Sequence, residues 1–137
     1  MPESIVKPTS PRVENLFFVY GTLRRGDDND ITRLQPAPRL IGAAHIAGTM
    51  YHLGSYPGVT LGGQGQVVGE VYGVCPALEK VLDAIEAEYP AQPDEYAKRA
   101  SCVQVAGQWH DCFVYEINPA YVQGKPLIAS GDWVLNR

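Results

Sequence analysis

A short apolar run near the start of the chain breaks into glycine, a hydroxyl group and two cations. The stretch reads Leu16-Phe17-Phe18-Val19-Tyr20-Gly21-Thr22-Leu23-Arg24-Arg25-Gly26. Its aromatic and branched residues favour a buried strand, and Gly21 permits a turn directly after it. A turn that exposes consecutive N–H groups can bind a carboxylate or an oxyanion. The same pattern also suits a plain junction between a strand and a loop.

Glu86 is the acidic residue whose position best suits proton transfer. A helix is predicted over 77–89, after Pro76, and its apolar residues recur at helical spacing: Leu78, Val81, Leu82, Ile85 and Tyr89. At about 100° per residue, Glu86 projects at the border of this apolar stripe. Partial burial there would raise the pKa of a carboxyl group toward neutrality, as a general base requires. A solvated flank of a docked helix has the same pattern.

The elements around these two sites are predicted to be mainly strands. We expect strands over 16–20, over 40–53 with interruptions at Gly42 and Gly48, and over 66–75. A hairpin over 100–117 with its turn at Gly107-Gln108, a loop over 119–126, and a strand over 127–135 broken at Gly131 complete the expected set. The turn over 54–58 and the 14 glycines favour a turn-rich, curving sheet.

The composition indicates one globular domain that acts on small molecules. The 137 residues suffice for a single core, and residues 1–14 read as a flexible tail before a domain over 15–137. A net charge of −4 argues against nucleic acid and anionic lipid as partners. The chain has no apolar run of membrane-spanning length and no secretory signal, so we expect a cytoplasmic protein. The oligomeric state is left open.

Neither the histidines nor the cysteines have the spacing of a metal site. The three histidines are scattered, so no metal is expected. Cys75, Cys102 and Cys112 are too few and too irregular for a disulfide framework. If Gly107 is the centre of the hairpin, Cys102 faces Cys112. That pair could then oxidise, or it could pack as two thiols.

The charged residues around the first loop allow two interpretations. Asp27, Asp28 and Asp30 lie close in sequence to Arg24, Arg25 and Arg33. They could form a solvated patch of ion pairs, with the stretch 27–30 supplying a cap for a short helical turn, or one of the first two arginines could contact substrate. Glu70, inside a predicted strand, is expected on its wet face.

Several motifs resemble, in order, those of the gamma-glutamylcyclotransferase-like (AIG2-like) family. The first is Tyr20-Gly21-Thr22-Leu23 at the end of a strand. The others are Ser55-Tyr56-Pro57-Gly58-Val59, Val68-Gly69-Glu70-Val71-Tyr72, Leu82-Asp83-Ala84-Ile85-Glu86, Tyr96 with Lys98 and Arg99, Val114-Tyr115, and Ser130-Gly131-Asp132-Trp133. Their common order from Leu16 to Trp133 carries the resemblance.

The resemblance implies an α+β fold, with a small curved or barrel-like mixed sheet and one main packed helix. It implies a cyclotransferase without cofactor or metal, in which a gamma-glutamyl amine or amide cyclises to 5-oxoproline and releases the free amine. Glu86 would be the general acid and base. The implied substrate contacts are Tyr20, Gly21, Thr22, Leu23, Tyr56, Tyr96 and Tyr115. The site would lie between the first loop and the helix.

Two alternatives stay open. One is a non-catalytic module that binds a gamma-glutamyl or other carboxylated metabolite, and the other is a relative that releases the gamma-glutamyl group from a different acceptor. The sequence departs from the family pattern at Ala87, where glycine is common, at the insertion-like 88–95 segment, and at Lys98, where arginine is common. A lysine cannot make the bidentate contact of an arginine. These departures bear on substrate identity more than on chemistry.

Overall fold

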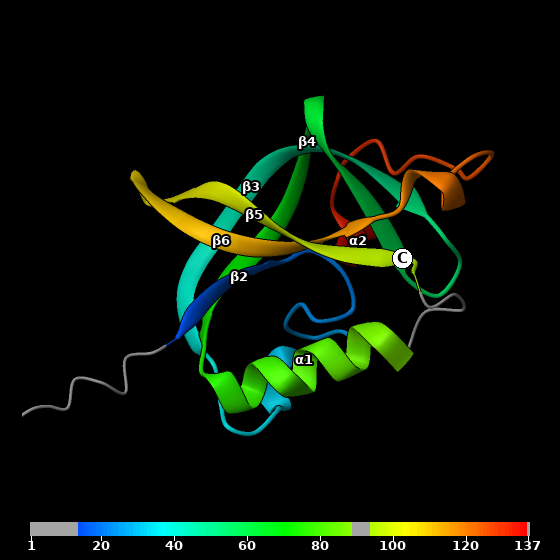
Figure 1. The fold of residues 1–137 in the computed structure, drawn as a ribbon. Coiled ribbons are helices and arrows are strands. Elements are labelled where there is room, and N and C mark those ends of the chain that lie inside the picture. The colour runs from blue at the N-terminus through cyan, green and yellow to red at the C-terminus, as the bar shows by residue number, and fades with distance from the viewer. Residues whose placement is uncertain (1–13, 89–93, 137) are drawn as a thin grey trace, which may run out of the picture.

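One curved mixed sheet of five strands forms the framework of the protein (Figure 1). The computed structural model describes residues 14–88 and 94–136. The strands are β2 (Asn15–Val19), β3 (Arg39–His52), β4 (Pro57–Val74), β5 (Tyr96–Val105) and β6 (Gln108–Ile117). They lie in the order β3-β4-β2-β6-β5, and only β2 and β6 pair in parallel.

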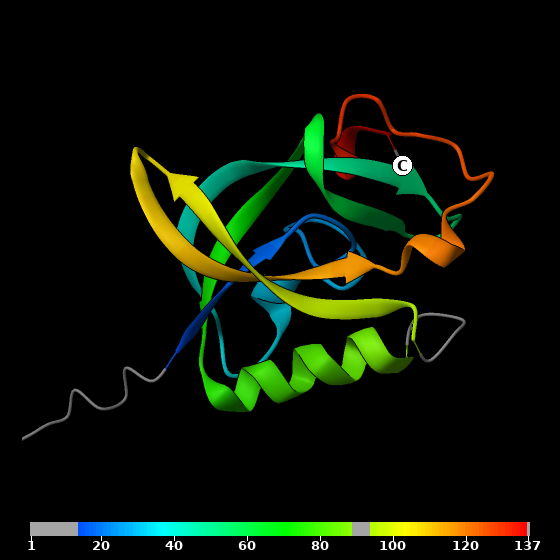
Figure 2. The same ribbon diagram turned by 45° about the horizontal axis from the view of Figure 1, so that its top comes forward.

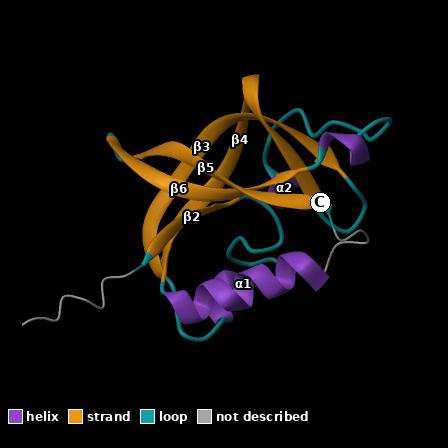
Figure 3. Ribbon diagram, viewed as in Figure 1, coloured by secondary structure: helices purple, strands orange, loops and turns teal. Residues whose placement is uncertain are grey.

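The sheet curls without closing, so β3 and β5 remain its edges (Figure 2). The two edges nevertheless come close, because a Cβ atom added at Gly42 of β3 would lie 2.7 Å from Cγ1 of Val105 on β5. The main helix, α1 (Pro76–Glu88), packs on one side of this sheet (Figure 3). The expected α+β fold with a curved mixed sheet is therefore confirmed.

The central strand β2 separates two apolar clusters. Phe18 faces a cluster inside the curl of the sheet, with Met50 of β3. Phe17 and Val19 face the opposite side, where they meet Leu78 of α1. These three residues of β2 are at most 3% exposed. Burying one such side chain stabilises the fold by about 1.5–3 kcal/mol, so β2 is a firmly packed support for the loop that follows it.

Helix α1 confirms the predicted helix and its apolar stripe as far as Ile85, while Tyr89, the last predicted member of the stripe, lies outside the described residues. Leu78 and Leu82 are fully buried, and Ile85 packs against the same cluster. Lys80 is exposed on the opposite face, as the helical spacing predicts. The helix is thus fixed against the sheet by one face.

Strands β3 and β4 form a long antiparallel pair bent at the predicted glycines. Register shifts fall between Leu40 and Gly42 and between Ala47 and Gly48. The start of β4 differs from the prediction, because the strand begins at Pro57 rather than at residue 66. A bulge over 62–65 interrupts the pairing. The glycines in this stretch have low strand propensity, so the sequence pattern did not predict a strand there.

The β5–β6 hairpin turns one residue earlier than predicted. Ala106 and Gly107, with φ of 50° and 84°, form the two-residue turn. Cys102 therefore lies opposite Asp111, while Cys112 lies opposite Ser101. The predicted facing of the two cysteines is wrong, since a shift of one residue changes every cross-strand pair. Cys75 and these two cysteines are all free thiols.

The two hairpin cysteines should differ in reactivity. Burial, together with the nearby charges of Asp111 and Cys102, raises the pKa of the Cys112 thiol to about 11. Cys102 is exposed. At about pH 8, iodoacetamide should therefore alkylate Cys102 in the folded protein while Cys112 stays protected. Peptide mass spectrometry measures both rates, with Cys102→Ser as the control. Faster labelling of Cys112 than of Cys102 in the folded state would contradict the expected order.

Residues 127–135 form no strand, so that prediction is wrong. Leu127 makes one isolated bridge to Tyr51 of β3. The chain then turns at Gly131, whose φ of 68° interrupts an extended course, and ends in the short helix α2 (Trp133–Asn136). Asp132 caps α2, since its Oδ1 accepts a hydrogen bond from the N–H of Leu135 at 3.3 Å.

The loop predicted over 119–126 is present and includes the short 3-10 helix η3 (Pro119–Tyr121). Of the predicted tail, residues 1–13 lie outside the described part, and Glu14 pairs with Arg39 of β3. No helix among the described residues has the length and apolar character needed to span a membrane.

Candidate active site

All seven predicted substrate contacts line one small cavity, with a volume of about 30 Å³. They are Tyr20, Gly21, Thr22, Leu23, Tyr56, Tyr96 and Tyr115. Phe18, Val19 and Pro57 complete the lining and were not predicted as contacts. Pro57 belongs to the Tyr-Pro-Gly turn noted in the sequence, which was the available signal for it. The structure thus brings together residues from four separate stretches of the chain.

Residues 20–31, which we call the pocket loop, begin with four consecutive residues that line the cavity. The N–H of Arg24 donates to the carbonyl of Gly21 at 3.0 Å, and the N–H of Ile31 donates to the carbonyl of Leu23 at 2.9 Å. In the described part of the chain, no hydrogen bond has the N–H of Gly21, Thr22 or Leu23 as its donor. Three consecutive donors at the cavity wall suit a carboxylate or a developing oxyanion.

Asp30 stabilises the far end of the pocket loop. It caps the 3-10 helix η2 (Ile31–Arg33) by accepting from the N–H of Thr32 at 2.9 Å, so the cap comes from the 27–30 stretch that was expected to supply it. Its second carboxylate oxygen accepts from the N–H of Gly26 at 2.8 Å. Burial alone would raise the pKa of Asp30, but these hydrogen bonds lower it below the ordinary value. The charged carboxylate therefore joins two parts of the loop.

Two tyrosine hydroxyl groups tie the walls of the cavity to one another. The hydroxyl of Tyr20 donates to the carbonyl of Tyr115 at 2.6 Å, and the hydroxyl of Tyr96 donates to the carbonyl of Pro57 at 2.7 Å. The first bond is buried and joins the end of β2 to β6. Each tyrosine is held by its backbone at one end and by a hydrogen bond of its hydroxyl group at the other. These residues therefore give the cavity a fixed shape.

Two further tyrosine hydroxyl groups donate to carboxylates. Tyr56 donates to Glu95 at 2.7 Å, and Tyr115 donates to Asp83 of α1 at 2.7 Å. Glu95 is 5% exposed and lies in the insertion-like segment, most of which falls outside the described residues. These two carboxylates could not be selected from the sequence, because their partners come from distant parts of the chain.

Lys98 of β5 links the sheet to helix α1 through two ion pairs. Its Nζ contacts Glu79 at 2.7 Å and Asp83 at 3.0 Å, and it lies 5.5 Å from the ring centre of Phe17. Burial lowers the pKa of Lys98, but the hydrogen bonds to the two carboxylates outweigh it and raise the pKa above its ordinary value. The lysine at this position thus binds two acids on one helix face, one turn apart.

Glu86 lies on α1, one turn beyond Asp83. Leu82 and Ile85 of the helix pack in the same apolar cluster as the lining residues Leu23 and Tyr115, although none of the described lining residues belongs to α1. The side chains of Glu86 and Ala87 are outside the described part of the structure. The position of the helix is therefore established, and the role of Glu86 stays a prediction.

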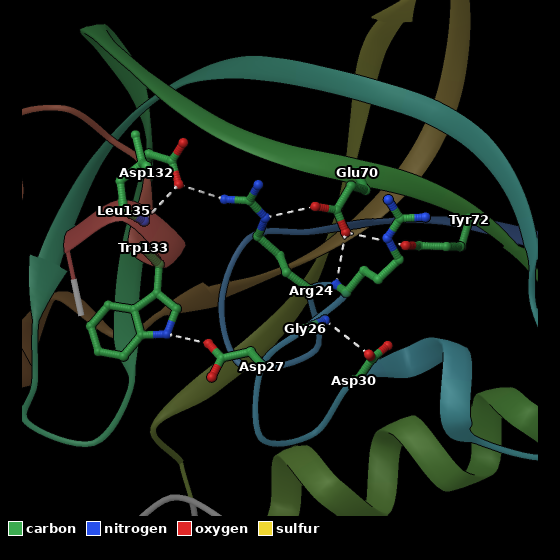
Figure 4. A network of polar contacts seen from close by, with 10 residues as sticks. Arg24, Gly26, Asp27, Asp30, Glu70, Tyr72, Asp132, Trp133 and Leu135 are labelled. Atoms are coloured by element: carbon green, nitrogen blue, oxygen red, sulfur yellow. Dashed lines mark hydrogen bonds and ion pairs between the residues drawn. The ribbon is translucent and has the colours of Figure 1, made fainter.

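Arg24 does not pair with the acidic cluster next to it in sequence. Its Nε lies 2.8 Å from Glu70 of β4, and its Nη1 lies 2.7 Å from Asp132 (Figure 4). Asp27 instead accepts a hydrogen bond from the indole N–H of Trp133 at 2.7 Å, and it is 6% exposed. The predicted solvated patch holds only for Arg33, which is exposed and 3.7 Å from Asp30.

Glu70 is half-buried rather than on the wet face of its strand, so that expectation is wrong. Its side chain is 16% exposed, and it also accepts from the hydroxyl of Tyr72 at 3.2 Å and from the N–H of Arg25 at 3.1 Å. Its charge is balanced by Arg24 instead of by solvent. Among the described residues, no three His, Cys, Asp or Glu side chains are grouped to hold a metal ion.

Comparisons with known proteins agree with this arrangement. Residues 17–135 match the family model described as gamma-glutamyl cyclotransferase, AIG2-like. A Vibrio cholerae relative that carries the name of a gamma-glutamylcyclotransferase is 35% identical over 123 residues, which cover 88% of this chain and 96% of the relative. A Niallia circulans relative, named gamma-L-glutamyl-butirosin B gamma-glutamyl cyclotransferase, is 35% identical over 121 residues, 85% of this chain and 76% of its own.

The solved structures include an AIG2-like protein from Mus musculus with the same fold. It superposes with a TM-score of 0.69 at 29% identity, over 87% of this chain and 88% of the mouse chain. The family match spans most of the described residues, including the pocket loop, α1 and Asp132. The chain therefore belongs to the gamma-glutamyl cyclotransferase, AIG2-like family, and it is an enzyme of that family.

Proposed function

We propose that this enzyme cyclises a gamma-glutamyl amine or amide to 5-oxoproline and releases the free amine, with Glu86 as general acid and base. The observation that carries the proposal is the set of three residues, Gly21, Thr22 and Leu23, which line the cavity and whose N–H groups donate to no other described residue. The Niallia circulans relative is named for a gamma-glutamyl compound, which supports the gamma-glutamyl group as the part recognised.

In the proposed reaction, the α-amine of the substrate attacks its own γ-carbonyl carbon. A bond forms between the α-nitrogen and the carbonyl carbon, and the bond from that carbon to the leaving nitrogen breaks. Glu86 takes one proton from the α-ammonium before the attack, and the nitrogen loses a second proton as the ring closes. Both protons pass to the leaving nitrogen, with Glu86 as the acid, so the amine is released as an ammonium ion. The sum is a rearrangement of the substrate into two products, with no water, metal or redox partner consumed.

The pocket loop and the aromatic walls would supply the remaining rate enhancement. The N–H groups of Thr22 and Leu23 would donate to the substrate carboxylate or to the oxyanion that develops on the γ-carbonyl oxygen. The walls fixed by Tyr20 and Tyr96 would hold the substrate folded, so that attacking and attacked atoms stay close. Orientation of this kind can contribute about 7–11 kcal/mol in well-oriented intramolecular reactions.

A substrate panel tests the proposal directly. The purified protein is incubated with gamma-glutamyl amino acids, gamma-glutamyl amines and glutathione, and 5-oxoproline is measured by mass spectrometry. We expect release from at least one compound of the panel, with unchanged rate in the presence of a chelator. Calorimetric binding of a panel compound without any 5-oxoproline would instead support a non-catalytic binding module. Activity that a chelator abolishes and added metal restores would contradict the metal-free mechanism.

The panel also tests which amine the substrate carries and whether the gamma-glutamyl group is cyclised or transferred. A free amine released together with 5-oxoproline identifies the acceptor side of the substrate. Transfer of the gamma-glutamyl group to another molecule, without ring closure, would favour the second alternative considered above. The predicted compartment is the cytoplasm, where such small substrates are the expected partners.

A further inference from the structure

The pocket loop is attached to the rest of the protein by ion pairs of a side chain that does not line the cavity, that of Arg24. Arg24 is not among the ten described residues that line the cavity. Its guanidinium group bridges Glu70 of β4 at 2.8 Å and Asp132 at 2.7 Å (Figure 4). The three side chains are 13–16% exposed, so solvent screens these ion pairs less than it screens exposed ones.

The segment Gly131–Asp132–Trp133, which we call the clasp, holds the loop at two points. Asp132 binds Arg24, and the buried Trp133 donates its indole N–H to the buried Asp27 at 2.7 Å. The two loop residues in these contacts, Arg24 and Asp27, are three positions apart in the sequence. Their partners Asp132 and Trp133 are neighbours in the clasp. A two-point attachment restricts rotation of the loop as well as its distance from the sheet.

The clasp is itself fixed to β4. The carbonyl of Gly131 accepts from the N–H of Val68 at 2.8 Å. A Cβ atom at Gly131 would lie 1.8 Å from the carbonyl oxygen of Gln66, and its φ of 68° already disfavours other residues. The backbone of the clasp therefore approaches β4 as closely as only glycine allows. Movement of β4 or of the clasp would be transmitted to Arg24.

Arg24 is directly connected to the donors at the cavity. It follows Leu23, and its own N–H closes the turn by donating to the carbonyl of Gly21 at 3.0 Å. The direction of the Thr22 and Leu23 N–H groups depends on the conformation of this turn. We propose that Asp132 is a positioning residue, which acts through Arg24 to orient the pocket loop N–H groups toward the reacting carbonyl. This inference rests on the proposed cyclisation.

Asp132→Ala should lower kcat about tenfold and change KM by less than about threefold. Arg24 keeps its ion pair with Glu70 in this variant, so it stays partly in place. Loss of the contact with Asp132 nevertheless loosens the turn, and small misplacements of catalytic groups lower the rate strongly. The pH dependence of kcat should stay as in wild type, because the proposed base is untouched. Asp132→Asn retains an oxygen that can accept from Arg24, so it should keep at least about a third of the wild-type kcat.

A matched control separates positioning from general destabilisation. Glu14→Ala also removes the carboxylate of an arginine pair, with Arg39, but at the start of β2, the end opposite the pocket loop. It should keep wild-type kcat. The second test is a double mutant with Gly21→Ala, which displaces the same turn by crowding Pro57. If both changes act on one turn, the double mutant loses less than the product of the single losses.

The outcomes distinguish this inference from the proposed function. Wild-type protein that releases no 5-oxoproline from any panel compound contradicts the cyclisation. If the wild type is active, two results would overturn the role of Asp132 alone. One is an unchanged kcat in folded Asp132→Ala, and the other is a double mutant whose loss equals the product of the two single losses. Amide chemical shifts provide a readout independent of activity. The Thr22 and Leu23 amides should shift in Asp132→Ala and not in Glu14→Ala, and unshifted amides would overturn the inference whatever the activity.

Discussion

Glu86→Gln should lower the kcat for 5-oxoproline release by at least about 100-fold. The amide keeps the shape of the side chain and cannot take the proton from the α-ammonium group of the substrate. The free energy of unfolding should stay close to that of wild type, since the packing of α1 depends on Leu78 and Leu82. Steady-state kinetics with the best panel compound, together with thermal unfolding, provides the measurement.

Binding should survive the Glu86→Gln substitution, and calorimetry should show it. Glu79→Gln serves as the control, because it makes the same chemical change on the same helix at a residue that binds Lys98. Its amide oxygen can still accept from Lys98, so we expect kcat within about threefold of wild type. A Glu86→Gln enzyme with normal turnover would end the assignment of Glu86 as the base and direct the search to the carboxylates of Asp83 and Glu95.

Gly21→Val should abolish cyclisation in a protein that still folds. The φ angle of Gly21 is not in the left-handed region, so the conflict is steric. A Cβ atom would lie 2.9 Å from Cγ of Pro57 and 3.0 Å from Cδ, and the proline ring has little freedom to move. The turn must therefore shift, and the N–H groups of Thr22 and Leu23 shift with it. Loss of one such donor typically costs about 10²–10³ in rate.

Arg25→Ala is the matched comparison for Gly21→Val within the same loop. Arg25 is exposed, and only its backbone N–H donates to Glu70, at 3.1 Å. Removing its side chain should change the rate less than about tenfold. Circular dichroism confirms that both variants fold. A folded Gly21→Val protein with wild-type turnover would show that the loop is only a connector.

Local patterns in the sequence were sufficient to predict β2, α1 and the glycine bends of β3. A run of aromatic residues before Gly21 and an apolar repeat with helical spacing depend on neighbours a few residues apart. The same reasoning failed where glycine weakened the signal, as in the first half of β4, and where one turn residue decided the register, as at Ala106. In the second case a single position moved Cys102 away from Cys112.

The side chains in and around the cavity also differ in whether local sequence patterns could predict them. The seven lining residues came from motifs and the family resemblance, and they gather in one place because the sheet brings four stretches together. The partners of Arg24 could not be predicted, since Glu70 is 46 residues away and Asp132 is 108 residues away. Sequence distance alone favoured the neighbouring aspartates, and only the packed structure shows that Asp27 is engaged by Trp133.

The position of the clasp late in the chain has a consequence for synthesis on the ribosome. All five strands and α1 have been made before Gly131 emerges, so the sheet can assemble while the pocket loop still lacks its outer anchor. The contact between Arg24 and Asp132 spans 108 residues and is among the most costly in loop-closure entropy. A nascent chain halted before Gly131 would thus contain every secondary-structure element of the site without a locked turn. Catalytic competence should appear as the last event of folding, after the core has formed.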